Sequence, residues 1–258
     1  TIEEITHASD KWLFDYISKY DVAGLVNHWY VSRFCNEENF KNFIEDFEKN
    51  YVNKDTQIFK PVDASKLRLD LGLAEKEVIV SVGRLVPRKG QDELVKALPQ
   101  VLKSHPNAHL LFVGTGSYKK VLDNLITERS LQHQVSFTGR VQYEDLAKYI
   151  CVGDIFAMPS RSRMAGLEVE GLGIVYLEAS ACGLPVLGGD SGGAPDAVLP
   201  GVTGLVVNGR DTKAVADGAI KLLDADRKAM GEAGRKWAVE TWDWEIWATK
   251  FVQLVRGA

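Results

Sequence analysis

The chain has 258 residues, of which 45% are hydrophobic and 26% charged, and its formal net charge at pH 7 is -4. These values are those of an ordinary globular protein of one or two domains, and the acidic balance argues against a general nucleic-acid binder. The three cysteines, Cys35, Cys151 and Cys182, are widely spaced and include no CxxC pair. They indicate buried, reduced thiols of an intracellular protein and exclude a disulfide framework.

No apolar run in the sequence is long enough to span a membrane. The first residues are polar and acidic, so no signal peptide is visible. We therefore expect a cytoplasmic protein, and an association with the inner face of the cell membrane stays open.

Residues 1–54 differ from the rest of the chain, since they contain no proline, one glycine and many aromatic residues. Apolar residues recur at helical spacing and predict three helices, near residues 9–17, 25–30 and 36–51. The apolar stripe of the third helix is typical of a packing face, and a groove for a partner is the alternative. This all-helical segment is a fusion or a partner-binding part in our interpretation.

Residues 55–258 alternate between apolar strands and helices, after a connector over 55–61 and a short helix over 62–73. Near-continuous apolar runs are typical of buried parallel strands, so this rhythm predicts one doubly wound, Rossmann-like parallel sheet. The expected strands cover 78–82, 109–113, 135–138, 154–158, 185–187 and 204–207. The expected helices cover 91–105, 118–130, 144–151, 174–182, 212–223, 227–239 and a Trp-rich 241–255.

One stretch, residues 166–185, organises this domain. Glu170 opens the turn Gly171-Leu172-Gly173, and a helix carrying Glu178 follows until Gly183. Glycines let a ligand approach the backbone, and the free N–H groups at a helix start favour an anion. Because Glu178 lies about two helical turns from Glu170, we expect both carboxylates to face one site. A plain Gly-rich turn is the structural alternative.

Other candidates follow buried strands, where the ligands of doubly wound sheets bind. Arg84 and Lys89 suit a diphosphate, one as a planar fork and one as a point charge, whereas Arg88 is interpreted as a solvated loop charge. The turn with Gly114 and Gly116 offers close approach, although a bare turn explains it equally well. The weaker candidates are Arg140, Arg163 and the turn Gly192-Gly193-Ala194-Pro195. The histidines show no metal-ligand spacing, and no Walker loop or Gly-x-Ser-x-Gly elbow is present.

Together these motifs resemble the nucleotide-sugar-binding half of a retaining GT-B glycosyltransferase of family 4, over residues 55–258. The residue sequence of these motifs is most similar to that of actinobacterial phosphatidylinositol mannosyltransferases, which use GDP-mannose, although enzymes that use UDP-sugars share much of it. The matching pieces are Ser81-Val-Gly-Arg-Leu-Val-Pro-Arg-Lys-Gly-Gln91, Phe112-Val-Gly-Thr-Gly116, Val135-Ser-Phe-Thr-Gly-Arg140, Asp154-Ile-Phe-Ala-Met-Pro-Ser160, Glu170-x7-Glu178 with Ala181-Cys-Gly-Leu-Pro-Val186, Ser191-Gly-Gly-Ala-Pro195 and Gly201-Val-Thr-Gly-Leu-Val206.

The resemblance implies a role for each matching position. Arg84 and Lys89 would hold the diphosphate and neutralise the leaving group. Glu170 would bind sugar hydroxyls, and Glu178 would accept hydrogen bonds from the ribose. The remaining donor-binding positions are Gly83, Gly114, Gly116, Arg140, Gly171, Leu172 and Gly173, with Val141 near the base. No metal and no cofactor beyond the nucleotide-sugar substrate are implied.

The departure from the family is the short N-terminal part. A GT-B enzyme has a second Rossmann-like domain that carries the acceptor site, and 54 helical residues do not match it. We therefore expect a fragment or a fusion, which needs an acceptor-domain partner chain for transfer. A non-catalytic nucleotide-binding module is the alternative, and an epimerase or phosphorylase on the same fold is a third reading.

Overall fold

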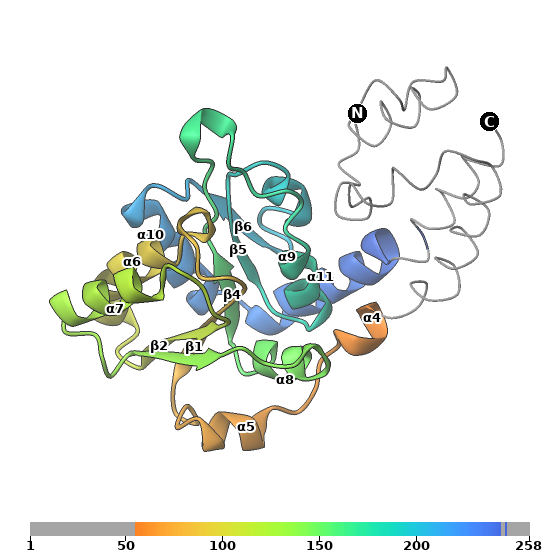
Figure 1. The fold of residues 1–258 in the computed structure, drawn as a ribbon. Coiled ribbons are helices and arrows are strands. Elements are labelled where there is room, and N and C mark those ends of the chain that lie inside the picture. Colours follow the sequence, from red (N-terminus) through yellow and green to blue (C-terminus); the bar gives the residue numbers. More distant parts are fainter. Residues whose placement is uncertain (1–54, 244–245, 247–258) are drawn as a thin grey trace. The chain divides into compact units, whose positions relative to one another are not determined.

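The computed structural model describes residues 55–243 and 246, and residues 55–243 form one compact unit (Figure 1). The predictions for residues 1–54, and for the Trp-rich helix beyond residue 243, lie outside the described residues. The proposed domain boundaries stay a prediction for the same reason.

The unit is built on a parallel sheet of six strands in the order β3-β2-β1-β4-β5-β6. The fold class that the βα rhythm predicted is confirmed, and each strand lies within two residues of its expected position. The strands are β1 (Glu77–Val82), β2 (Ala108–Val113), β3 (Val135–Gly139), β4 (Ile155–Met158), β5 (Val186–Gly189) and β6 (Gly204–Val207).

Helices cover both faces of this sheet (Figure 1). The α-helices are α4 (Asp55–Ile58), α5 (Ser65–Asp70), α6 (Gln91–Ser104), α7 (Lys119–Glu128), α8 (Leu146–Ile150), α9 (Ile174–Ala181), α10 (Thr212–Asp224) and α11 (Arg227–Trp242). The 3-10 turns are η3 (Pro87–Lys89), η4 (Tyr143–Asp145), η5 (Met164–Gly166) and η6 (Ala194–Ala197). One core joins the sheet to α8, α9 and α11, and the other joins it to α6, α7 and α10.

Strand β1 shows why its sequence reads as a continuous apolar run. Val78, Val80 and Val82 belong to the core on the α9 side, and Ile79 belongs to the core on the α6 side. Successive side chains of a strand point to opposite faces, and here both faces are buried. Of the buried positions of β1 only Ser81 is polar, and the alternation expected of a half-exposed strand is absent.

Several helix boundaries differ from those expected, and helix α4 lies in the segment over 55–61 that was predicted to be a connector. Helix α5, predicted over 62–73, ends at Asp70 and starts only at Ser65, because Asp63 Oδ1 accepts a hydrogen bond from Ser65 N at 2.9 Å in a turn before it. Helix α11 runs without a break through Trp242, where the sequence reading had placed an end at residue 239. No Gly or Pro lies between 239 and 242, so nothing local ends the helix there.

The strand order places a topological switch point between β1 and β4. The chain proceeds from β1 outward to β3, and then returns to the middle of the sheet to form β4 on the other side of β1. In open α/β sheets, ligands bind outside the carboxyl ends of the strands at such a point. The loops that leave β1 and β4 therefore mark the region of the candidate site.

Candidate functional site

The turns after β1, β2 and β3 lie side by side at the carboxyl edge of the sheet. Gly83 N donates to Val113 O at 2.9 Å, and Gly114 N donates to Gly139 O at 2.8 Å. A Cβ on Gly114 would overlap the carbonyl oxygen of Gly83, and one on Gly116 would overlap that of Leu85. The close packing of neighbouring turns thus explains why these two positions are glycine, independently of any ligand.

The loops after β1 and β4 are tied together at the switch point. Arg161 N donates to the carbonyl oxygen of Arg88 at 2.8 Å. Gly90 has a φ of 74°, and a Cβ there would overlap the carbonyl oxygen of Pro159. Only glycine combines that left-handed conformation with so close an approach. The loop that carries Arg88 and Lys89 is therefore fixed against the loop that leads to Glu170.

A buried group of charges lies where these loops meet, and we name Arg88, Lys89 and Glu170 the Lys89 cluster. Lys89 Nζ donates to Glu170 Oε1 at 2.8 Å, with side chains that are only 10% and 7% exposed. Arg88 Nε lies 3.6 Å from Glu170 Oε2. The interpretation of Arg88 as a solvated loop charge is wrong, because the turn η3 directs its half-buried side chain toward the carboxylate.

Burial and neighbouring charges act on Lys89 in opposite directions. Loss of water lowers the pKa of Lys89, and the Glu170 carboxylate raises it; the positive charges of Arg88 and Arg84 lower it further, and the net pKa lies below 10.5. The Arg84 side chain is exposed, yet its charge acts on Lys89. Arg84 and Lys89, the two cations that the sequence singled out, therefore share one electrostatic environment.

Two polar atoms of the Lys89 cluster are buried without a hydrogen bond. Arg88 Nε and Glu170 Oε2 have no hydrogen-bond partner among the described residues. An unsatisfied buried acceptor is costly, and in native proteins such a group calls for an explanation. A ligand hydroxyl that donates to Glu170 Oε2 would supply the missing partner.

The backbone around Glu170 is fixed by the loop after β5. Glu170 N donates to Ser191 Oγ at 2.9 Å, and Gly193 N donates to Gly171 O at 2.7 Å. The predicted turn Gly192–Pro195 therefore lies against the motif. Sequence reasoning did not single out Ser191, although it opens that motif and is fully buried. A serine that follows a strand end was the available signal.

Helix α9 begins directly after this fixed backbone. Gly173, with a φ of 71°, precedes the first helical residue, and its Cβ would overlap the Tyr176 ring. Tyr176 is fully buried and donates to Met158 O at 2.7 Å, which anchors the helix to β4. Glu178 lies in α9 and is half-buried. That it faces one site with Glu170 stays a prediction.

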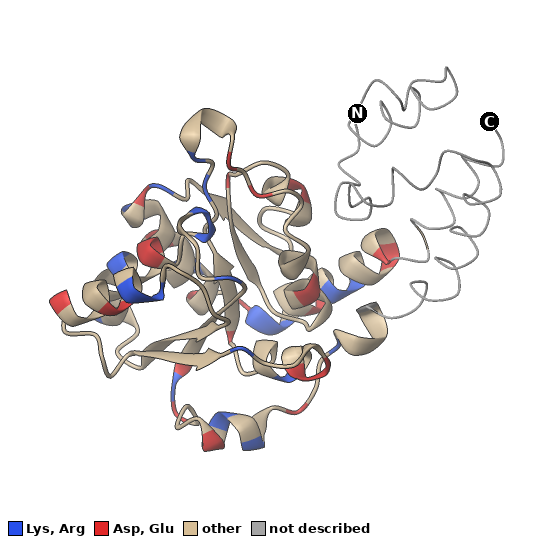
Figure 2. Cartoon of the chain, viewed as in Figure 1, with Lys and Arg blue, Asp and Glu red and all other residues tan. Residues whose placement is uncertain are grey.

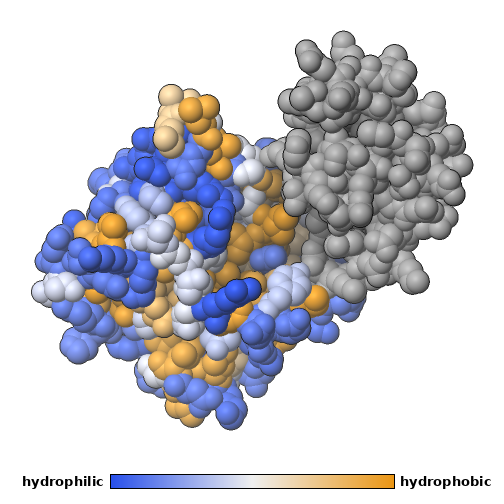
Figure 3. Space-filling model, viewed as in Figure 1, coloured by the Kyte–Doolittle hydropathy of each residue, from blue (hydrophilic) through white to orange (hydrophobic). Residues whose placement is uncertain are grey.

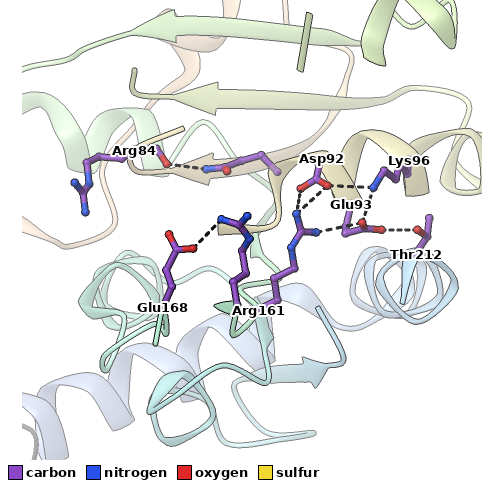
Figure 4. Close-up of polar contacts among 9 residues, drawn as sticks. Arg84, Asp92, Glu93, Lys96, Arg161, Glu168 and Thr212 are labelled. Carbon is purple, nitrogen blue, oxygen red and sulfur yellow. Dashed lines mark hydrogen bonds and ion pairs between the residues drawn. The ribbon is translucent and has the colours of Figure 1, made fainter. Parts of the chain in front are cut away.

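A second network, absent from the sequence reading, supports the loop after β4 (Figure 4). Arg161 donates to Asp92 at 2.7 and 2.9 Å and to Glu93 at 3.2 Å. Lys96 also pairs with both carboxylates, and Thr212 donates to Glu93. These contacts join α6, α10 and the loop after β4, so they position the loop and are not themselves placed to meet a ligand.

The remaining candidates are more scattered. The carbonyl oxygen of Arg84 accepts from Gln91 at 3.1 Å, which leaves its guanidinium exposed (Figure 4). Arg140 is exposed after β3, and Val141 packs against the core on the α9 side. Arg163 pairs with Glu168 at 2.7 Å within its own loop. The structure thus brings Lys89 and Glu170 together and leaves Arg140 and Arg163 without a contact to them.

The described part of the chain contains neither a candidate metal site nor a helix that could span a membrane. Between residues 55 and 243, no group of three or more His, Cys, Asp or Glu side chains is arranged to hold a metal ion. No helix in that part combines the length and the apolar character needed to cross a bilayer.

Comparison with known proteins agrees with this geometry. Residues 64–237 match the family described as glycosyl transferases group 1. A Corynebacterium glutamicum protein, GDP-mannose-dependent monoacylated alpha-(1-6)-phosphatidylinositol monomannoside mannosyltransferase, is 48% identical over 200 residues, or 76% of this chain and 52% of its own. A Mycolicibacterium smegmatis GDP-mannose-dependent alpha-(1-6)-phosphatidylinositol monomannoside mannosyltransferase is 42% identical over 239 residues, or 92% and 62%.

The fold is also similar to solved structures. Anabaena HepE in complex with UDP superposes with a TM-score of 0.71 at 26% identity, over 80% of this chain and 56% of that one. The chain spans 52–62% of the length of the two curated relatives and the HepE structure named above. The family match covers most of the described residues and includes both loops of the candidate site. The chain therefore belongs to the group 1 glycosyl transferases.

Proposed function

We propose that this chain is the donor-binding part of a glycosyltransferase that takes a nucleotide-sugar, with GDP-mannose favoured, and transfers the hexose with retention to a lipid acceptor. The observation that carries the proposal is the buried Lys89 cluster at the switch point of the sheet. Cations beside a carboxylate with an unsatisfied oxygen suit a diphosphate next to a sugar hydroxyl. The curated relatives named above use GDP-mannose on phosphatidylinositol mannosides, which supports the choice of donor and acceptor.

Each residue has a role in this proposal. Lys89 uses one of its three N–H donors on Glu170, so two remain for the diphosphate. Arg84, exposed and within electrostatic reach of Lys89, adds a second cation that neutralises the leaving group. Glu170 Oε2 accepts from a sugar hydroxyl, and Glu178 accepts from the ribose. The backbone N–H groups that open α9, after Gly173, meet phosphate or sugar oxygens.

The positions near the base and the phosphates complete the proposed donor site. Arg140 and Val141 follow β3 and flank the base, and the turns with Gly83, Gly114 and Gly116 line the same edge of the sheet. Transfer needs no metal in this scheme, because the two cations carry the charge of the leaving diphosphate.

A nucleotide-binding module without turnover is the second candidate function. The similarity to Anabaena HepE, which was solved in complex with UDP, supports nucleotide binding by this fold. The two candidates share the donor site and differ only in turnover, so nucleotide binding tests both before any assay of transfer.

Calorimetric titration with GDP and UDP tests the donor site directly. We expect GDP to bind more tightly than UDP, and Lys89→Ala to weaken GDP binding at least tenfold, because hydrogen bonds to charged groups contribute about 1.5–3 kcal/mol. Glu178→Ala should weaken binding by about tenfold through the lost ribose contacts. Lys66→Ala is the matched control, since this lysine is 91% exposed on α5. Binding of neither nucleotide, or equal loss in Lys66→Ala, contradicts the proposal.

A further inference from the structure

A short hairpin leaves the carboxyl edge of the sheet between β4 and α9, and we name residues 163–168 the 163–168 hairpin. Arg163 N donates to Glu168 O at 2.7 Å, and Glu168 N donates back to Arg163 O at 3.2 Å. The two side chains pair as well, with Arg163 Nη1 at 2.7 Å from Glu168 Oε2. Backbone and side chains thus close the base of the hairpin, which gives its tip a defined shape.

The tip presents large apolar side chains to solvent. Leu167 is 88% exposed and Met164 is 69% exposed, and Val169 adjoins them at 43%. Figure 3 shows the tip as an apolar projection above a hydrophilic surface. Single exposed apolar residues are common on protein surfaces, but large ones gathered on one projecting turn are typical of an interaction site.

The backbone of the tip is held in an unusual conformation. Met164 and Ala165 have φ values of 49° and 52°, in the left-handed region that residues with a side chain rarely occupy. Such residues gather at functional sites, where the surrounding structure imposes them.

The charges around the tip have a clear distribution. Figure 2 shows no charged residue on the tip itself, and a basic and an acidic segment face each other at its base. The exposed Arg210 also reaches this region, where its guanidinium donates to Ser162 O. Glu168 offsets the charge of Arg163, whereas no ion pair holds Arg210 among the described residues. An apolar tip beside this exposed guanidinium is complementary to an anionic bilayer, because the apolar side chains enter the acyl boundary and the guanidinium meets the phosphates.

The hairpin is continuous with the candidate site, since Glu168 precedes Glu170 by two residues. A lipid acceptor keeps its acyl chains in the bilayer while its headgroup reaches the donor sugar, so the site must lie close to the membrane surface. We propose that the 163–168 hairpin docks this domain on an anionic bilayer by inserting Met164 and Leu167. The choice of a bilayer over a protein partner rests on the proposed function.

Vesicle co-sedimentation of the full chain, without nucleotide, tests the proposal. We expect roughly tenfold tighter binding to vesicles of equal phosphatidylcholine and phosphatidylinositol than to phosphatidylcholine alone, because each surface cation is attracted to anionic lipid. Leu167→Glu should weaken binding at least tenfold, because the variant loses the favourable transfer of the Leu167 side chain from water into the bilayer. Met164→Glu should act in the same direction. Leu69→Glu is the matched control, since Leu69 is 67% exposed on α5.

Three outcomes overturn the docking proposal. They are no binding of the wild type to either vesicle, binding of Leu167→Glu at wild-type strength, and equal loss in Leu69→Glu. Sedimentation velocity addresses a protein partner: a wild type that self-associates, beside a monomeric Leu167→Glu, makes the tip a contact between chains and also overturns the proposal.

A separate GDP titration keeps the two proposals apart. We expect Leu167→Glu to bind GDP like the wild type, because its side chain does not contribute to the donor site. Vesicle binding without GDP binding sinks the proposed function and leaves the docking surface standing. GDP binding without vesicle binding does the reverse.

Discussion

Lys89 is a buried cation whose charge is only partly compensated in the absence of a ligand. Its ammonium has already lost most of its water, and Glu170 compensates for only part of that loss, so its pKa lies below 10.5. A buried cation with little water left to shed binds an incoming phosphate at a lower desolvation cost than a solvated one. The neighbouring charges of Arg88 and Arg84 make the electrostatic potential at Lys89 more positive, which favours an anion there.

The lowered pKa of Lys89 predicts how nucleotide binding depends on pH. We expect GDP affinity to fall on the alkaline side at a pH below 10.5, because a neutral Lys89 no longer attracts the diphosphate. Calorimetry across the alkaline range measures this midpoint. Lys89→Arg is the control: its guanidinium stays protonated, and ionisation of the nucleotide itself affects both proteins alike. An identical pH profile for the two proteins contradicts the prediction.

The lowered pKa of Lys89 makes stability depend on pH in the direction opposite to nucleotide affinity. In the unfolded chain Lys89 regains its ordinary pKa, so between the two pKa values the unfolded state binds more protons than the folded state. The contribution of Lys89 to the free energy of unfolding therefore rises as pH increases through that window, while nucleotide affinity falls. Function and stability are opposed at this residue.

At the scale of elements, the position of the loop after β4 depends on α6. Arg161 is 11% exposed and bridges Asp92 and Glu93, which are themselves 6% and 7% exposed. Both carboxylates lie in the first turn of α6, where the helix dipole favours negative charge. The loop that carries Glu170 is thus attached to the first turn of α6, and this attachment helps to set the position of the loop.

Removal of Arg161 should separate these elements. We expect Arg161→Met to lower the free energy of unfolding by about 3–5 kcal/mol, because it leaves the two buried carboxylates with Lys96 as their one cation among the described residues and Glu93 with the Thr212 hydroxyl besides. Urea unfolding followed by circular dichroism gives the value. Lys213→Met, which breaks the exposed pair with Asp217, should have a much smaller effect, because solvent screens that pair. Comparable losses in the two variants would show that the buried network adds nothing.

At the scale of the whole molecule, the centre of the sheet packs against the helix that carries Glu178. Phe156 lies in β4, fully buried, and its ring meets that of Tyr176 edge-on with centroids 6.0 Å apart. Tyr176 in turn belongs to α9 and donates to Met158 O. The core beneath the switch point therefore connects the sheet to the helix that carries Glu178.

Truncation at this centre should destabilise the entire unit. We expect Phe156→Ala to lower the free energy of unfolding by about 3–5 kcal/mol, the usual cost of an aromatic cavity in a core. Thermal and urea unfolding both report it. Leu69→Ala, on an exposed residue of α5, should change stability by no more than about 0.5 kcal/mol. A small effect at Phe156 would mean that the core collapses to fill the space.

The elements of this domain were predictable because their causes are local. Both faces of the sheet are covered, so the buried positions of β1 and β2 are apolar except Ser81 and His109, and the apolar runs stand out in the sequence. Gly173 and Gly183 bracket α9 at positive φ, as their place in the sequence indicated. The end of α11 was misplaced, because no residue at 239–241 ends a helix and only the folded chain shows how far it continues.

The sequence alone determined which edge of the sheet carries the candidate residues, since the loops that hold Lys89 and Glu170 both follow strand ends. It did not determine which charges meet. The Lys89–Glu170 pair joins residues 81 positions apart, and Arg88 was misjudged as solvated because burial is a property of neighbours. The contacts of Arg161 and Ser191 and the exposure of the 163–168 hairpin could likewise not be predicted from the sequence. Local periodicity follows from the covalent chain, whereas pairing, desolvation and exposure arise only when distant segments share one space.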